Sequence, residues 1–270
     1  MAVSVHPFFD PDTCSYSYLI ADPRTRQAAV IDPVLNYDPE SSTSRTQTAD
    51  DIVALVQVHR YEVSWILETH VHADHLSAAA YLKMKFPAAR SGIGKRIDEV
   101  RRDYLRSHRC RNTAISFDAL FTDSDEIRLG DQALQVLATP GHTPACVTYR
   151  INDMAFVGDA LFMPDFGTGR CDFPGGCAHQ LYRSIRRLLA LPDDTRLFVG
   201  HDYAPGGRVY RFVTTVADER RANRHVHDGV SEAQFVAMRN GRDAKLTAPR
   251  LLNTAVRANL FVITSGGVAV

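Results

Sequence analysis

A stretch of potential metal ligands, His70, His72, Asp74 and His75, constrains this chain more than any other feature. It directly follows Val63–Glu68, an apolar run with the length of a buried strand. Three histidines and an aspartate in one short stretch serve packing poorly, because buried polar groups cost free energy unless they are paired. Four such side chains cannot all face one way. We therefore expect a sharp turn from strand to helix that offers alternate side chains to two adjacent metal positions.

Three further potential ligands, His142, Asp159 and His201, follow predicted apolar strands, where a side chain projects from the sheet edge into a cleft. Each alone is more often an ordinary loop residue, so their weight comes from the combination with the His70–His75 stretch. Imidazole and carboxylate groups, with no thiolate in the set, suit zinc, iron or manganese. A chain of 270 residues buries a large core without a metal, so we expect any metal here to be functional.

The order of the predicted elements indicates two sheets packed between helices. Apolar and polar residues alternate over Ser15–Ile20 and Gln27–Ile31, which predicts two strands. Gly130-Asp131 and Asn152-Asp153 each separate two short strands, as in hairpins. The sequence further predicts helices over residues 48–59, 76–86, 179–191, 214–223 and 231–240, a strand over 195–199 and a loop over 38–48. Along the chain, a group of strands with helices occurs twice and is followed by a helical tail. This order predicts an α+β sandwich.

Charge and composition exclude some partners. The chain has 31 Lys and Arg against 31 Asp and Glu, and this net charge of 0 argues against nucleic acid. No apolar run reaches the roughly 18 residues of a membrane span, and residues 1–10 lack the basic and apolar regions of a signal peptide. The 5 cysteines form no Cys-x-x-Cys pair, as in cytosolic proteins with reduced thiols. We expect a cytoplasmic protein that binds neither nucleic acid nor membranes.

The stretch His70-Val-His72-Ala-Asp74-His75, followed by His142, Asp159 and His201, resembles the metallo-β-lactamase superfamily. The resemblance runs from about Phe9 to Tyr203. It implies an αββα sandwich with the metal cleft at one edge of the two sheets. We expect a single domain over residues 1–270, with a core of about 1–207 and a helical C-terminal extension over 208–270. The fold alone does not fix the reaction, because it hosts hydrolases, oxidoreductases and nucleases.

Narrower motifs resemble the persulfide dioxygenase branch of this superfamily. Many superfamily hydrolases, including glyoxalase II, have two glycines soon after the first histidine motif, where this chain has Leu76-Ser77-Ala78-Ala79. The motifs that carry the resemblance are Thr168-Gly-Arg-Cys-Asp-Phe173, Gly158-Asp-Ala-Leu-Phe162, Gly200-His-Asp-Tyr203, residues 13–22 and residues 228–235. The resemblance implies oxidation of glutathione persulfide by O2 to sulfite and glutathione.

For the metal site, the resemblance implies one Fe(II) per chain, held by the catalytic ligands His70, His142 and Asp159. Two histidines and a carboxylate on one face of an octahedron leave three positions open for substrates. The remaining potential ligands would support these three residues or form a vacant second metal site; they are His72, Asp74, His75 and His201.

Two alternatives stay open from the sequence. Every ligand of a two-zinc thioester hydrolase of the glyoxalase II type is also present, and such a site would generate hydroxide. A non-catalytic metal-binding protein that responds to sulfur compounds would carry the same residues. Oxygen consumption with glutathione persulfide separates the three hypotheses.

Glutathione brings two carboxylates, so we expect cations and hydroxyls in its cleft. The candidates are Tyr203, Arg220, Asn223 and, by resemblance, Arg170. Arginine suits bidentate capture of a carboxylate, although Arg220 also fits a solvated helix face and Arg170 a brace for the cleft. Cys171 stands where many members of the persulfide dioxygenase branch have threonine, and it is either a neutral packing thiol or a residue that relays sulfur or is sensitive to oxidation. The sequence leaves open whether the chain forms a homodimer.

Overall fold

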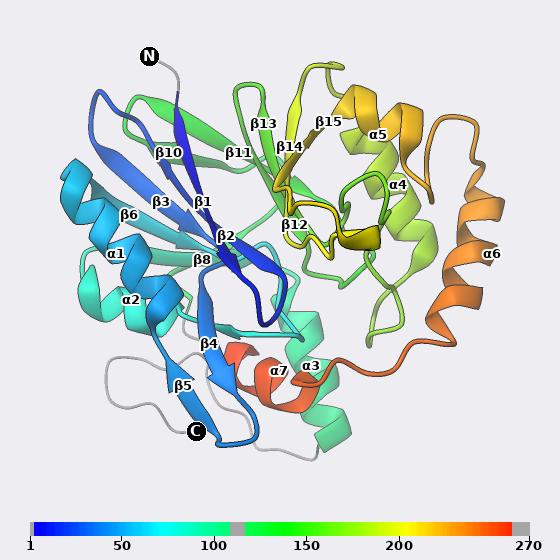
Figure 1. The fold of residues 1–270 in the computed structure, drawn as a ribbon, viewed down its shortest axis with the longest axis horizontal. Coiled ribbons are helices and arrows are strands. Elements are labelled where there is room, and N and C mark those ends of the chain that lie inside the picture. The colour runs from blue at the N-terminus through cyan, green and yellow to red at the C-terminus, as the bar shows by residue number, and fades with distance from the viewer. Residues whose placement is uncertain (1–2, 109–116, 261–270) are drawn as a thin grey trace.

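Two large sheets face each other in the structure, a computed structural model that describes residues 3–108 and 117–260 (Figure 1). The first sheet has the strand order β1-β2-β3-β6-β8-β9 and the second β10-β11-β12-β13-β14-β15, while β5-β4-β7 form a small third sheet. The strands are β1 Ser4–Asp10, β2 Ser15–Ala21, β3 Gln27–Ile31, β4 Val34–Asp38, β5 Thr43–Arg45, β6 Glu62–Leu67, β7 Leu76–Ser77, β8 Arg90–Gly94, β9 Ala119–Phe121, β10 Glu126–Leu129, β11 Gln132–Ala138, β12 Val147–Ile151, β13 Met154–Gly158, β14 Arg196–Val199 and β15 Val213–Thr215.

The helices are α1 Gln47–His59, α2 Ala79–Lys85, α3 Ile97–His108, α4 Ala178–Leu188, α5 Val216–Ala222, α6 Glu232–Asp243 and α7 Leu252–Leu260, with a 3-10 turn at Pro205–Gly207. Within the described ranges, no helix is long and apolar enough to cross a membrane. Cys110 and the end of the predicted C-terminal extension, residues 261–270, lie outside the described residues.

The inner core lies between the two sheets because alternate strand residues point to opposite faces. On β2, Tyr18 and Ile20 point inward and pack with side chains of the second sheet such as Tyr149 and Phe156. The intervening Leu19 points outward, into a second core with Ile52 and Leu82 of α1 and α2. Successive side chains of β2 therefore point to opposite faces of the sheet and pack into two different hydrophobic cores.

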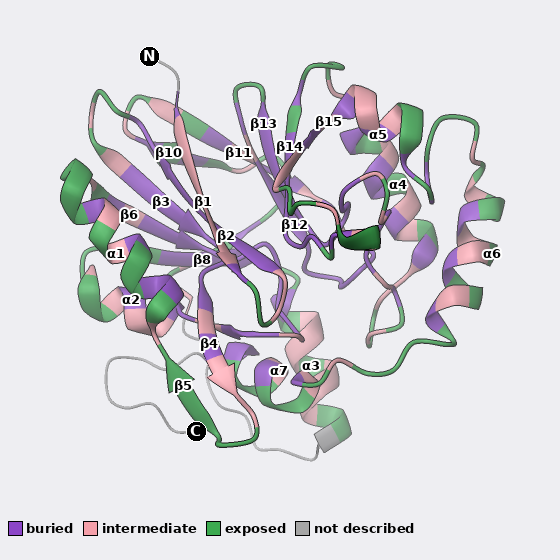
Figure 2. Cartoon of the chain, viewed as in Figure 1, coloured by how far each residue is buried: buried purple, intermediate pink, exposed green. Residues whose placement is uncertain are grey.

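Helices cover the outer face of each sheet, which gives four layers. On the second sheet, Leu181 and Ile185 of α4 and Phe235 of α6 pack on Ala155 and Val157 of β13. Figure 2 shows the buried residues concentrated in the strands and on the inner sides of these helices. The predicted αββα sandwich is confirmed.

Several sequence expectations need correction. The expected loop over 38–48 contains β5, which pairs with β4. The expected helices over 76–86 and 214–223 each begin with a short strand, β7 or β15, before the helix starts. Strand β15 pairs with β14 and so belongs to the second sheet, although it lies inside the predicted extension. These short edge strands escape detection because long-range pairing, and not local periodicity, defines them.

The carboxyl ends of several strands meet at one edge of the sandwich. In the first sheet β3 is parallel to β6, and in the second sheet β13 is parallel to β14. Strand β11 runs antiparallel to β12, which is antiparallel to β13, so β11 ends at the same edge. All the predicted metal ligands follow these strands, so the topology gathers residues that are up to 131 positions apart, from His70 to His201.

Candidate metal centre

His70, His142 and Asp159 come together at this edge, each from a segment that follows a different strand. One ligand atom from each lies within 4.8 Å of the others, and all three side chains are buried. Asp159 Oδ2 lies 3.5 Å from His142 Nε2 and 3.9 Å from His70 Nε2. Ligands bound about 2.1 Å from one ion are separated by about 3 Å at right angles and by about 4.2 Å when opposite. The measured separations fall within that range.

A hydroxyl fixes the ring of His70. Thr69 Oγ1 donates to Asp32 Oδ2 at 2.8 Å and lies 2.9 Å from His70 Nδ1. Since the hydroxyl proton is directed to Asp32, the hydrogen bond to the ring requires that Nδ1 carry the proton. Burial and the neighbouring His72 and His142 hold the pKa of His70 well below its usual range, so the ring is neutral. Its Nε2 lone pair therefore remains available to a metal.

A backbone carbonyl does the same for His142. His142 Nδ1 lies 2.7 Å from the carbonyl oxygen of Arg170, which can only accept, so Nδ1 donates and Nε2 is left for the metal. Such outer hydrogen bonds fix the tautomer of a metal-binding histidine and orient its ring. Gly169 packs beside this bond: a Cβ there would lie 2.2 Å from the carbonyl oxygen of Asp159.

Unpaired buried atoms show that these residues fit a metal. His70 Nε2 and Asp159 Oδ1 are buried and have no hydrogen-bond partner in the described part of the chain. The same holds for His72 Nδ1 and His75 Nε2. A buried polar group without a partner costs about 1–3 kcal/mol, a cost that a bound cation removes. The nitrogen and oxygen donors suit iron, zinc or manganese.

A second group of ligands adjoins the first through Asp159. His201 Nε2 lies 3.4 Å from Asp159 Oδ1 and 3.5 Å from Asp74 Oδ2. Asp74 Oδ2 also lies 3.0 Å from His75 Nδ1. The hydroxyl of Ser15 contacts both histidines, at 3.4 Å from His75 Nδ1 and 3.3 Å from His201 Nδ1. Three of the four residues of the expected second set, Asp74, His75 and His201, therefore lie together, with Asp159 between the two groups.

His72 faces two buried carboxylates. Its Nε2 lies 3.1 Å from Asp32 Oδ1 and 3.2 Å from Glu68 Oε2. Burial alone would lower the pKa of His72, but Asp32 and Glu68 outweigh it and hold that pKa well above its usual range. Glu68 also accepts a hydrogen bond from Ser77. His72 thus links the ligand stretch to Asp32 and Glu68, which directly follow β3 and β6 of the first sheet.

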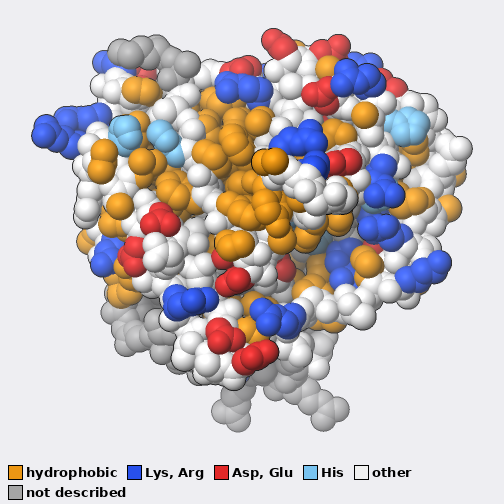
Figure 3. Space-filling view, viewed as in Figure 1, with side chains coloured by type: hydrophobic (Ala, Val, Ile, Leu, Met, Phe, Trp, Pro, Cys, Tyr) orange, Lys and Arg blue, Asp and Glu red, His pale blue; other side chains and the backbone are white. Residues whose placement is uncertain are grey.

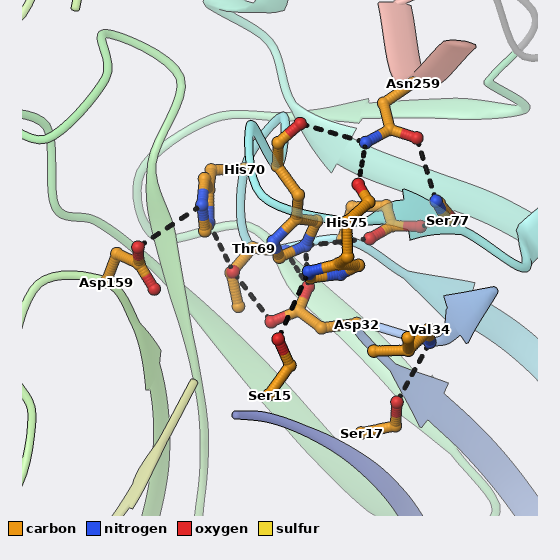
Figure 4. A network of polar contacts seen from close by, with 12 residues as sticks. Ser15, Ser17, Asp32, Val34, Thr69, His70, His75, Ser77, Asp159 and Asn259 are labelled. Atoms are coloured by element: carbon orange, nitrogen blue, oxygen red, sulfur yellow. Dashed lines mark hydrogen bonds and ion pairs between the residues drawn. The ribbon is translucent and has the colours of Figure 1, made fainter. Parts of the chain in front are cut away.

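The last described helix holds the ligand stretch by its backbone. Asn259 of α7 donates from Nδ2 to the carbonyl oxygens of His72 and His75, both at 2.9 Å, and its Oδ1 accepts from Ser77 N at 2.8 Å. Figure 4 shows Asn259 bonded to the backbone of the ligand stretch, with one contact leading from His75 to Ser15 and a separate line of contacts joining Asp32, Thr69, His70 and Asp159. A single buried amide therefore closes the turn that the sequence predicts.

Among the expected substrate contacts, Tyr203 lies beside the ligands. Its ring stacks on His201 with centroids 5.6 Å apart, and on Phe166 at 4.5 Å. The residue is 42% exposed, so part of its side chain is accessible from solvent. Figure 3 shows hydrophobic side chains gathered near the middle of the face in view.

The structure gives Arg170, Arg220 and Asn223 other partners. Arg170 pairs with Asp172 through two 2.6 Å bonds and donates to the carbonyl of Thr247, in keeping with a brace. Arg220 is held by Asp193 and by Asp228, both at 2.9 Å.

Asn223 is fully buried and donates to Gly167 O and Glu219 Oε2, which leaves it no surface for a ligand. The sequence predicted that Arg220 and Asn223 bind a carboxylate, because residue types and spacing do not reveal that both side chains already have partners within the protein.

Cys171 is a buried packing thiol in the structure. It is 8% exposed, and its backbone amide donates to Asp243 Oδ2 at 2.8 Å. Burial and the nearby Asp243 raise its pKa far above the usual value, so the thiolate is not populated. This supports the packing interpretation over a reactive one.

Sequence reasoning missed Asp32, Ser15 and Asn259. Asp32 carries the signal that was used for Asp159, a carboxylate directly after an apolar strand. Ser15 opens β2 and has no distinguishing pattern, and Asn259 lies in α7, a helix of the predicted helical extension whose own bounds were not predicted. Only Asp32 could have been found from the strand pattern.

Comparisons with known proteins agree with this geometry. A family model described as the metallo-beta-lactamase superfamily matches residues 12–201. A probable metallo-hydrolase of Burkholderia pseudomallei is 46% identical, with 96% of this chain and 92% of that protein covered. The human mitochondrial persulfide dioxygenase ETHE1 is 33% identical, over 96% of this chain and 88% of that protein. The crystal structure of ETHE1 from Myxococcus xanthus matches with a TM-score of 0.77 at 35% identity, covering 96% of this chain and 98% of the other.

Proposed function

Because the chain belongs to the metallo-beta-lactamase superfamily, we propose that it is a persulfide dioxygenase that uses one Fe(II) per chain, held by His70, His142 and Asp159. Its substrates would be glutathione persulfide and O2, and its products sulfite and glutathione. The observation that carries the proposal is the convergence of two oriented imidazoles and a carboxylate at one buried point. Similarity to the human persulfide dioxygenase supports the reaction, while the similarity to a probable metallo-hydrolase makes the assay below decisive.

The overall change balances with one water. A persulfide, O2 and water give a thiol, sulfite and two protons, and the two sulfur atoms together lose the four electrons that O2 gains. Iron, when bound, supplies the single-electron chemistry that lets O2 react with a closed-shell sulfur.

This chain's own residues prepare the site for that chemistry. The hydrogen bonds of Thr69 to His70 and of the Arg170 carbonyl to His142 keep both Nε2 atoms free and oriented. His201 Nε2 lies between the two carboxylates of the site, 3.4 Å from Asp159 Oδ1 and 3.5 Å from Asp74 Oδ2. The ring of Tyr203, stacked on His201, forms an apolar wall for the persulfide.

The test is oxygen consumption by the anaerobically iron-loaded protein with glutathione persulfide. We expect one sulfite per O2, about one iron per chain, and loss of both metal and activity in Asp159→Ala. Two stoichiometric zinc ions with full activity, or no O2 uptake by the iron-loaded protein, would refute the proposal.

A dinuclear hydrolase is the second candidate, and one observation favours it. Among the described residues, His72 Nδ1 and His75 Nε2 are buried without hydrogen-bond partners, and Asp159 faces both ligand groups, as a bridging carboxylate would. That enzyme would release thiol from S-lactoylglutathione without O2 and would need two metal ions per chain. A non-catalytic metal-binding protein would do neither, so the same pair of assays separates all three functions.

A further inference from the structure

We propose that Arg239 and Asp243, on α6 of the C-terminal extension, are positioning residues for the metal ligand His142. They would act through the segment Thr168–Cys171, which lies between α6 and the metal ligands. The inference concerns metal binding and requires that His142 binds a metal, but it does not depend on which reaction follows.

Arg239 is a buried cation, and each of its three guanidinium nitrogens donates a hydrogen bond. It is 1% exposed, the largest of the fully buried side chains. Its Nε and Nη2 donate to Asp243 Oδ1 at 2.9 and 2.6 Å, and its Nη1 donates to the carbonyl of Thr168 at 3.1 Å. Burying a charge is costly unless it is paired, so this arrangement gives α6 one strongly preferred position against Thr168.

The same ion pair also holds the other end of the segment. Asp243 Oδ2 accepts from the backbone amide of Cys171 at 2.8 Å, while its Oδ1 binds Arg239. Thr168 and Cys171 are thus fixed from one side by two residues that are one helical turn apart. A displacement of either end would break a hydrogen bond to a buried charged group, to Arg239 at Thr168 or to Asp243 at Cys171.

Between these two ends the segment contacts the metal ligands. The carbonyl of Arg170 accepts from His142 Nδ1 at 2.7 Å. Gly169 lies so close to the backbone of Asp159 that an added Cβ would be 2.2 Å from its carbonyl oxygen and 3.3 Å from His142 Nδ1. The Arg239–Asp243 pair therefore sets the position of the acceptor that orients His142.

A third anchor strengthens the same segment. Thr168 N donates to His225 Nδ1 at 3.1 Å, so that nitrogen must be unprotonated. Burial, Arg239 and two further arginines, Arg242 and Arg224, lower the pKa of His225 to about 3. The ring stays neutral at physiological pH, and the acceptor persists. Arg239 thus supports the hydrogen bond between Thr168 and His225 in addition to donating its own hydrogen bond to Thr168.

The test is metal affinity, measured by anaerobic competition with a chromophoric chelator, with Co(II) as a spectroscopic probe. Arg239→Met should bind Fe(II) about 10- to 100-fold more weakly, the usual effect of losing an outer hydrogen bond to a metal ligand. The Co(II) d–d absorption should shift. Arg239→Lys keeps the charge but not the planar fork, so we expect a smaller change in the same direction. At saturating metal, kcat should fall while KM for the persulfide is unchanged.

A matched control separates positioning from general destabilisation. Phe235 lies on the same helix, is fully buried, and belongs to the core without bonding to Thr168–Cys171. Phe235→Leu should lower the thermal midpoint but leave metal affinity and the Co(II) spectrum as in the original protein. If Arg239→Met does not fold, Arg239→Lys and Asp243→Asn are measured with the same readouts.

Two results would overturn the inference. One is a folded variant of the pair with unchanged metal affinity and an unchanged Co(II) spectrum. The other is an equal loss of affinity in Phe235→Leu at the same loss of thermal stability. If instead the original protein bound no metal, the proposed metal centre itself would fail.

Discussion

Replacing Thr69 with valine removes one hydroxyl and almost nothing else, which makes it a sharp test of the metal centre. In the structure this hydroxyl donates to Asp32 Oδ2 at 2.8 Å and accepts from His70 Nδ1 at 2.9 Å. Thr69→Val keeps the shape but leaves the ring N–H of His70 buried without an acceptor. It also frees that ring to change tautomer, which would place the proton on Nε2, the nitrogen that faces the metal, or to flip, which would turn Nε2 away from the metal.

The expected magnitude follows from these two bonds. Each typical hydrogen bond contributes about 1 kcal/mol net to stability, so the metal-free protein should lose about 2 kcal/mol. For a chain of this size, that corresponds to a fall of about 4–8 °C in the thermal midpoint. Metal affinity should fall about 10- to 100-fold, as for other outer partners of metal-binding histidines.

Metal affinity is measured by chelator competition and stability by thermal denaturation with and without metal. Thr69→Ser retains the hydroxyl and should restore metal affinity, although it loses a buried methyl group. If Thr69→Val binds metal as tightly as the original protein, then the hydroxyl does not fix the ring, and our account of His70 is wrong.

Three further predictions concern other parts of the chain. Asn259→Ala removes three hydrogen bonds to the ligand stretch, so we expect a free energy of unfolding about 3 kcal/mol lower and weaker metal binding. As a control, Asn253→Ala at an exposed position of the same helix should change neither stability nor metal binding. Burial raises the pKa of Glu219 to about 8, so the stability that its neutral form contributes is present at low pH and is lost as the pH rises from about 4.5 through 8. Glu219→Gln should therefore raise the thermal midpoint relative to the original protein at pH 8.5 but not at pH 4.5. Equal shifts at both pH values would contradict the assignment. Because Asp193 and Asp228 already hold Arg220, Arg220→Ala should leave both iron content and KM for glutathione persulfide unchanged, and an increased KM would restore the carboxylate contact expected from the sequence.

The sequence alone indicated the candidate metal ligands and the layers. His70, His142 and Asp159 were among the seven candidates because each follows an apolar strand, while their grouping as one iron site came from the resemblance to the persulfide dioxygenases. The αββα order could be predicted because strand alternation and helical periodicity are local properties of the chain. The short strands β5, β7 and β15 could not, since pairing with distant segments defines them.

Only the tertiary structure decided how the ligands are held. The bonds that orient them join Asp32 to Thr69, Thr168 to Arg239, and Asn259 to His72, pairs that are 37, 71 and 187 residues apart. It also showed that Arg220 and Asn223 already have partners within the protein. Local patterns show which side chains have metal-binding chemistry, because that depends on residue type and on the strand before it. Which partners complete the hydrogen bonds of a buried group depends on chain segments that meet only when the sheets and the C-terminal helices have packed together.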